Sequence, residues 1–179
     1  KIASSREKSK KTAETEKAPK TDKTDEKTDI AVDEKESKSL ELDLEDKVSF
    51  EGIEIDQSIT SLKIKNAEKL TDISALASLK NLNELDLSWC EKLTDISALA
   101  SLKNLNELFL NDCYKLTDIS ALASLENLKK LDLKRCEELT DISALASLEN
   151  LESLDLSYCP KIKNIDVLKS LTNTESSIL

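Results

Sequence analysis

The stretch LTDISALASL decides the fold of this chain, because it occurs unchanged four times, beginning at Leu70, Leu93, Leu116 and Leu139. A looser fifth copy, IKNIDVLKSL, begins at Ile162 and keeps the same 23-residue spacing. An exact internal repeat of this length indicates that one structural unit is used several times in succession.

One unit predicts a helical turn followed by a short strand. Its apolar residues first recur every three positions, at Ile73, Leu76 and Leu79, which suits one or two turns of 3₁₀ or α-helix with one side buried. They then alternate at Leu85 and Leu87, which places both on one face of a strand.

Two polar residues mark the ends of the predicted helix. We expect Asp72 to act as its N-cap, with the carboxylate accepting hydrogen bonds from the first turn. We expect Asn81 to adopt the left-handed conformation where the chain turns back into the strand, because only one glycine, Gly52, is present in the chain.

A single such unit cannot bury its own leucines, so successive units must stack. Periods of about 20–29 residues with this leucine spacing indicate leucine-rich repeats. We therefore predict an α/β fold, a right-handed solenoid with a parallel sheet on its concave face and short helices or 3₁₀ turns on its convex face. The repeats occupy residues 70–179, after an N-terminal cap and degenerate first repeat over 40–69, and we expect the C-terminal cap to be absent or truncated.

The first 39 residues contain almost no large apolar side chain and are predicted to form a disordered, charged tail or linker. Residues 1–20 carry seven basic and three acidic groups, whereas residues 21–46 carry four basic and eleven acidic groups. A solvated spacer and an electrostatic docking segment both fit this pattern. Since the sequence begins with Lys and contains no Met, we expect a fragment or a processed form.

Composition excludes several classes of function. The absence of His removes Ser-His-Asp catalysis and all His-containing metal sites, and the single glycine rules out a phosphate-binding loop. A net charge of −10 argues against a nucleic-acid partner, which requires clustered Lys and Arg. No apolar run approaches the roughly 18 residues of a membrane span, so we expect no membrane insertion within this sequence. We also predict no enzyme activity, cofactor or metal.

Residues 59–173 resemble the bacterial leucine-rich repeats of the internalin type, whose repeat reads roughly LxxLxLxxNxIxDIxxLxxLxx. The resemblance covers about two-thirds of the chain. It implies a curved solenoid whose concave sheet binds a protein, often on a cell surface. The chain departs from the family in its longer period and in having cysteine where the family has a ladder of asparagines, at Cys90, Cys113, Cys136 and Cys159.

Three interpretations of these cysteines are open. Because the thiols occur once per coil in a line, they do not converge as zinc ligands do. Neighbouring cysteines lie within Cα range of a disulfide, but their parallel side-chain directions would strain one. The third interpretation is a ladder of reduced, buried thiols that act as small apolar groups.

The outward positions of the predicted sheet differ from unit to unit, whereas the helical decamer does not. This contrast fits a constant frame with a variable face, and it fits drift at solvated positions as well. Aromatic side chains and Arg are typical interface anchors, and three aromatics project from this face. We predict the partner-binding residues to be Trp89, Phe109, Asn111, Asp112, Lys130, Asp132, Lys134, Arg135, Asp155 and Tyr158.

Charged residues on this face also have an explanation that involves no partner. Opposite charges fall at equivalent positions of neighbouring strands, and such cross-strand pairs stabilise a sheet on their own. We expect three of them: Lys63 with Asp86, Glu107 with Lys130, and Asp112 with Arg135.

One pair of like charges, Asp132 beside Asp155, admits a chemical interpretation. Two carboxylates at that separation could act as a glycosidase pair or hold a weakly bound cation. We expect neither, because the site should be an open sheet without a cleft and the nearby Lys130 and Lys134 should keep both carboxylates ionised.

The sequence thus favours a module that binds a protein through its concave sheet, secreted or on a bacterial cell surface. The alternatives are a cytoplasmic location, and a structural spacer in a larger protein with no ligand of its own.

Overall fold

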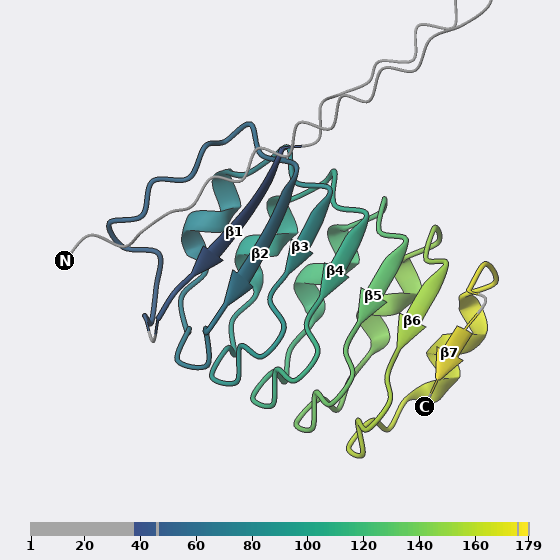
Figure 1. Ribbon diagram of the computed structural model, residues 1–179. Coiled ribbons are helices and arrows are strands. Elements are labelled where there is room, and N and C mark those ends of the chain that lie inside the picture. Colours follow the sequence, from purple (N-terminus) through teal and green to yellow (C-terminus); the bar gives the residue numbers. More distant parts are fainter. Residues whose placement is uncertain (1–37, 46, 175, 179) are drawn as a thin grey trace, which may run out of the picture. The chain divides into compact units, whose positions relative to one another are not determined.

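The computed structural model describes residues 38–45, 47–174 and 176–178. It forms a single parallel sheet of seven strands in sequence order (Figure 1). The strands are β1 (Ser39–Asp43), β2 (Ser61–Lys65), β3 (Glu84–Asp86), β4 (Glu107–Phe109), β5 (Lys130–Asp132), β6 (Ser153–Asp155) and β7 (Ser176–Ile178). From β2 onwards each strand residue pairs with the residue 23 positions later in the sequence. The register between neighbouring strands therefore equals the period of the sequence repeat.

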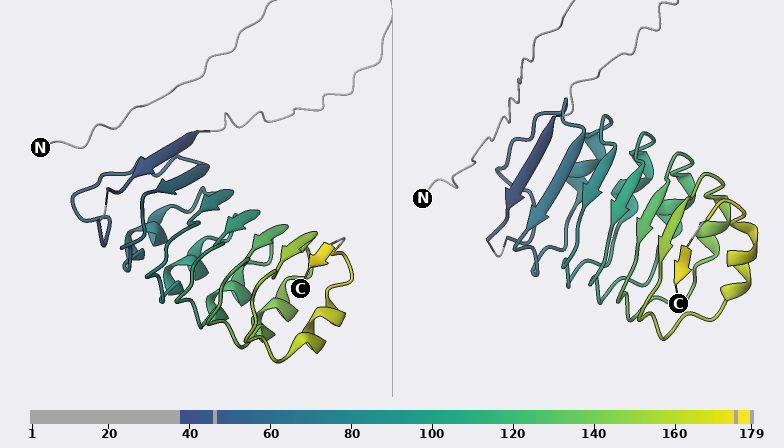
Figure 2. Two further views of the ribbon diagram at one scale, coloured as in Figure 1. Left: turned by 60° about the horizontal axis from the view of Figure 1, so that its bottom comes forward. Right: turned by 45° about the vertical axis from the view of Figure 1, so that its right-hand side comes forward.

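Short 3₁₀ helices cover one face of the sheet, the convex face (Figure 2). They are η1 (Ser74–Ser78), η2 (Ser97–Ser101), η3 (Ser120–Ser124), η4 (Ser143–Ser147) and η5 (Ile165–Ser170). The predicted parallel-sheet solenoid with short turns on its convex side is therefore confirmed. The helices are too short for α-helical hydrogen bonding to propagate, which is the length at which 3₁₀ geometry is common.

The predicted helix cap is displaced by one residue. Ile73, not Asp72, occupies the N-cap position of η1. The Asp72 carboxylate still accepts a hydrogen bond from the backbone N–H of Ser74, at 2.8 Å, and the equivalent aspartates of the next three coils do the same. Asp72 therefore supports the first helical residue from outside the helix.

The core is one continuous column of leucines between the sheet and the helices. Leu85 of β3 and Leu87 directly after it are buried, as the alternation predicts. Leu76 of η1 and the two residues that flank this helix, Ile73 and Leu79, are buried as well, as the spacing of three predicts. Because each coil repeats the same positions, every buried side chain lies against its equivalents in the neighbouring coils.

Asparagine has a different role from the one predicted. Asn81 is not among the left-handed residues of the described chain. Its side-chain amide donates to the backbone carbonyl of Gln57 in the preceding coil, at 3.0 Å. The equivalent residues Asn104, Asn127, Asn150 and Asn173 each donate in the same way to the coil before. The prediction was wrong because asparagine is needed here for its side-chain amide, which donates a hydrogen bond to a backbone carbonyl, and not for its tolerance of positive φ.

The expected N-terminal tail falls almost wholly outside the described residues, since only residues 38 and 39 of that segment are described. The first strand begins at Ser39, and its Leu40 and Leu42 pair in register with Leu62 and Ile64 of β2. The alternation of leucines at the start of the cap segment thus corresponds to a strand of the same sheet.

Candidate functional site

A row of left-handed residues lies on the concave side, three positions beyond the last residue of each of four consecutive strands. The row consists of Trp89, Asp112, Arg135 and Tyr158, with φ of 66°, 61°, 59° and 61°. We call these four residues the left-handed row. Asn66 holds the same position in the preceding coil, at φ 50°. Asn and Asp tolerate this conformation, whereas for other side-chain-bearing residues it costs roughly 1–2 kcal/mol.

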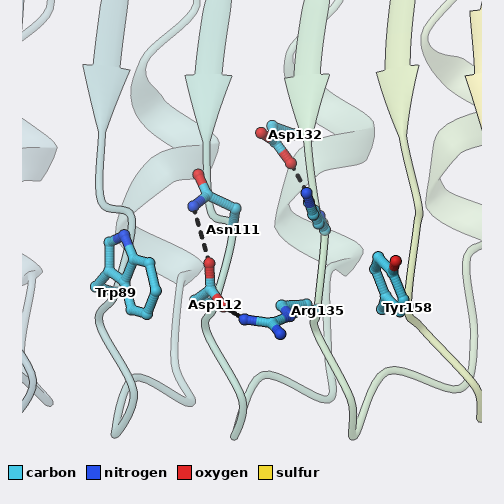
Figure 3. A pocket seen from close by; sticks show the side chains of 7 residues that line it. Trp89, Asn111, Asp112, Asp132, Arg135 and Tyr158 are labelled. Carbon is cyan, nitrogen blue, oxygen red and sulfur yellow. Dashed lines mark hydrogen bonds and ion pairs between the residues drawn. The ribbon is translucent and has the colours of Figure 1, made fainter.

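The reason for the unusual backbone is the hydrogen bonding between coils. With this conformation, the N–H of Trp89 donates to the Asn111 carbonyl at 2.9 Å, and that of Arg135 donates to the Ser157 carbonyl at 2.9 Å. The ladder of the sheet is therefore continued past the formal strand ends. As a consequence, the four side chains stand side by side on successive coils (Figure 3).

A shallow pocket of about 490 Å³ opens over the row. It is lined by seven residues, all of which were predicted from the sequence: Trp89, Asn111, Asp112, Asp132, Lys134, Arg135 and Tyr158. The other three predicted residues, Phe109, Lys130 and Asp155, belong to strands β4, β5 and β6 and do not line it. The predicted surface is thus divided between a pocket beyond the strand ends and the sheet beside it.

Asp112 is the organising centre of the pocket. Its side chain is buried, with 4% of the residue exposed, and three neighbours donate to it. These are the Arg135 guanidinium at 3.3 Å, the Tyr114 hydroxyl at 2.9 Å and the Asn111 amide at 3.1 Å. The hydrogen bond to Asp112 raises the pKa of both Arg135 and Tyr114 above their usual values. Tyr114 was missed in the sequence because it lies in the turn after the row and its hydroxyl reaches back.

The aromatic side chains differ in how freely a partner can reach them. Trp89 and Tyr158 are 50% and 70% exposed. The cations of Lys134 and Arg135 lie 5.8 and 5.9 Å from the centre of the Tyr158 ring, which favours a fixed ring position. Phe109 is only half-buried, but the Lys130 ammonium lies 4.9 Å from its ring centre. A partner therefore finds more exposed aromatic surface at Trp89 and Tyr158 than at the half-buried Phe109.

The three expected cross-strand pairs all form. Lys63 contacts Asp86 at 2.9 Å, Arg135 contacts Asp112 at 3.3 Å, and Lys130 approaches Glu107 at 3.9 Å. Much of the charge on the concave face is thereby explained without a partner, because cross-strand pairs of opposite charge stabilise a sheet on their own.

Asp132 departs from the expectation that its carboxylate lies on an open surface. It lines the pocket and faces Asp155 in register across β5 and β6. Burial raises its pKa, although the backbone N–H of Lys134 donates to it at 2.9 Å; the charge of Asp155 raises the pKa further. Asp132 therefore lies in a shallow pocket, whereas Asp155 does not line that pocket. The described residues contain no group of three or more potential metal ligands.

The cysteines form a row along the coils, in which Cys90, Cys113 and Cys136 are buried and Cys159 is partly buried. All four are free thiols, and burial raises the pKa of Cys90 to about 12 and that of Cys159 to about 11. The Cys113 thiol donates to the Leu87 carbonyl of the preceding coil at 3.4 Å, and Cys136 and Cys159 repeat this contact one coil further on. The thiols thus occupy the place of an asparagine ladder and supply a weaker version of its hydrogen bonds.

The left-handed row makes a direct prediction for stability. Glycine normally weakens an extended strand relative to alanine, but it relieves a left-handed position. We expect Tyr158→Gly to be more stable than Tyr158→Ala by about 1 kcal/mol. At the exposed strand residue Lys130 we expect the reverse order, with alanine ahead by about 0.5–1 kcal/mol. Urea denaturation of the four variants measures both differences; the same order at both positions would contradict the positive φ at Tyr158.

Comparison with known proteins identifies the class. Residues 57–179 match the family described as "BspA type Leucine rich repeat region", in six copies. The chain belongs to this family of leucine-rich repeat proteins. Leucine-rich repeat proteins of this kind are generally protein-binding and generally lack enzyme activity.

Among solved structures, the chain is similar to an internalin (inlF) from Listeria monocytogenes, with 30% sequence identity and a TM-score of 0.62. That match covers 79% of this chain and 47% of the internalin, so the chain spans about half the length of its relative. An internalin C2 (inlC2) from the same organism matches at 27% identity and a TM-score of 0.44, covering 79% of this chain and 80% of that one. A search of curated proteins found no match. The predicted likeness to internalin-type repeats is confirmed.

Two further properties concern the described residues. Their helices include none long and apolar enough to cross a membrane. The absence of catalysis stays a prediction; among the charged side chains that line the pocket, Asp112 and Arg135 are paired with each other.

Proposed function

We propose that this chain is a protein-binding module of a secreted or surface-exposed bacterial protein, and that the partner binds over the concave-face pocket and the adjoining sheet. The observation that carries the proposal is the exposure of Trp89 and Tyr158 on a face whose charges are largely paired. The apolar surface of a large exposed aromatic side chain stays in contact with water unless a partner covers it. Such side chains are typical binding anchors.

The convex face supports the choice of side. Its exposed residues repeat nearly unchanged from coil to coil, so they offer little basis for distinguishing one partner from another. Several are also engaged within the fold: Lys80 donates to the Ser101 carbonyl at 3.3 Å, and Lys103 donates to the Ser124 carbonyl at 2.9 Å. The location at a bacterial surface rests on the likeness to an internalin and on the family.

Partner identification followed by variant binding tests this function. Candidate partner proteins that cross-link to the full chain are purified, and their affinities for variants of this chain are measured. We expect Trp89→Ala and Arg135→Ala each to weaken binding by about 2 kcal/mol, which is the usual loss when an interface anchor is truncated. Lys80→Ala and Lys103→Ala, on the convex face, are the matched controls and should bind as the unaltered chain does.

The opposite pattern, loss with the convex variants and none with the concave ones, would place the partner on the helices and overturn the proposal. A chain that cross-links to no protein would favour a structural spacer.

A further inference from the structure

The left-handed row has a spacing that restricts what can bind along it. Trp89 and Tyr158 follow strands β3 and β6, which are three coil steps apart in one parallel sheet. Neighbouring strands lie about 4.8 Å apart, so the two aromatic side chains are held about 14 Å apart along the stacking direction. Between them lie Asp112 and Arg135, whose ion pair makes the middle of the row polar.

An extended polypeptide matches this spacing. It advances about 3.3 Å per residue, so 14 Å corresponds to roughly four residues. In an extended chain, residues i, i+2 and i+4 point to the same side. The first and last of these would meet the two aromatic rings, and the middle one would meet the ion pair.

We infer that the pocket binds an extended segment of the partner, running across the strands, with two apolar side chains four residues apart and a polar side chain midway between them. This inference rests on the proposed function and specifies the chemistry of the partner. The pocket volume of about 490 Å³ lies within the range of small ligand sites, so it has room for side chains of such a segment. Arg135 donates one of its five N–H groups to Asp112, which leaves others for the polar side chain.

The backbone of the row favours the same conclusion. Trp89, Arg135 and Tyr158 are held in a conformation that their side chains disfavour, while Asn66 shows that an asparagine can occupy the position. The hydrogen bonds between coils account for the backbone conformation, but they do not require a large side chain at these positions. Large side chains at these positions are accounted for if they contact a ligand.

Synthetic peptides of differing spacing test the inference on the full chain. Each fluorescein-labelled peptide carries two leucines separated by two, four or six positions, with glutamine midway and serine elsewhere; a peptide with one leucine is the reference. Fluorescence polarisation gives the affinities. We expect the four-position peptide to bind about tenfold more tightly than the reference, because only in this peptide do both leucines reach an aromatic ring. The other two spacings should bind like the reference.

Variants show whether the row is responsible. Trp89→Asn and Tyr158→Asn introduce the residue that Asn66 already places at this position, so the fold should be retained, which circular dichroism checks. Each should reduce the four-position peptide to the affinity of the reference. Lys103→Ala, on the convex face, is the matched control and should keep the spacing preference. Phe109→Ala, on the adjoining strand β4, tests whether the strands contribute to recognition.

Equal binding of all spacings, or a preference that survives both asparagine variants, would overturn the inference. If the peptides fail while Trp89→Ala still weakens a purified protein partner, the proposed function stands and the extended-segment geometry is wrong. If Phe109→Ala alone removes the preference, recognition lies on the strands and not on the row.

Discussion

Leu108→Ala should lower the free energy of unfolding by about 2–5 kcal/mol, the range for removing a large buried side chain and leaving a cavity. Leu108 is fully buried in β4 and lies in register between Leu85 and Leu131 of the flanking strands. Its loss therefore affects the packing of both neighbouring coils. Urea denaturation monitored by circular dichroism measures the effect.

Leu168→Ala is the comparison for this effect. Leu168 lies in η5, is only partly buried, and belongs to the last helix of the described array. Because the stability of a repeat protein is approximately a sum over neighbouring units, a terminal leucine should contribute less than a central one. Equal losses in the two variants would argue that the chain does not behave as a one-dimensional stack.

Alkaline pH should destabilise the protein through its buried thiols. Burial raises the pKa of the Cys90 thiol from 9.0 to about 12, so the folded state binds its proton more tightly than the unfolded state does. The contribution of this thiol to the free energy of unfolding is therefore fully present below pH 9 and is lost as the pH rises towards 12. The difference of about three units between the two pKa values corresponds to about 4 kcal/mol of folding free energy for this one group. The thiols of Cys113, Cys136 and Cys159 shift in the same direction.

The measurement is the urea midpoint between pH 7 and 11, which should be level up to about pH 9 and then fall. Tyr114 and Lys63 also have raised pKa values and titrate in the alkaline range, so the wild-type curve alone does not isolate the thiols. Cys90→Ala removes one thiol and should give a shallower fall above pH 9. Parallel curves for the two proteins would show that the Cys90 thiol is not responsible.

Strands, helices and core follow from the period of the sequence, because leucine spacing depends directly on which side of a coil is buried. Leu85 and Leu87 alternate, and Ile73, Leu76 and Leu79 recur every three positions; each pattern has one structural solution once the coils stack. The cross-strand ion pairs could be predicted for the same reason, since a fixed period places equivalent residues side by side.

The left-handed row could not be predicted from individual residues. Trp89, Arg135 and Tyr158 are residue types that seldom adopt positive φ, so local propensity points to Asn81 instead. A signal was nevertheless present, because Asn66 occupies the same position one coil earlier. The pocket depends on side-chain lengths and on the burial of Asp112, which repeat spacing alone does not specify.

The asparagines at the turns into the strands, Asn81 and its equivalents in the following coils, make the number of coils an adjustable property of this architecture. The side-chain amides of Asn104, Asn127 and Asn150 donate to the backbone carbonyls of Lys80, Lys103 and Glu126, so each of these bonds joins a coil to its immediate neighbour. A duplicated 23-residue unit therefore meets the same contacts wherever it is inserted. Inserted between Asp112 and Arg135, it would move Trp89 and Tyr158 apart by about 4.8 Å, one strand spacing. Under the binding mode inferred above, gain or loss of whole units would change the length of the bound segment in fixed steps and would keep the same repeating core.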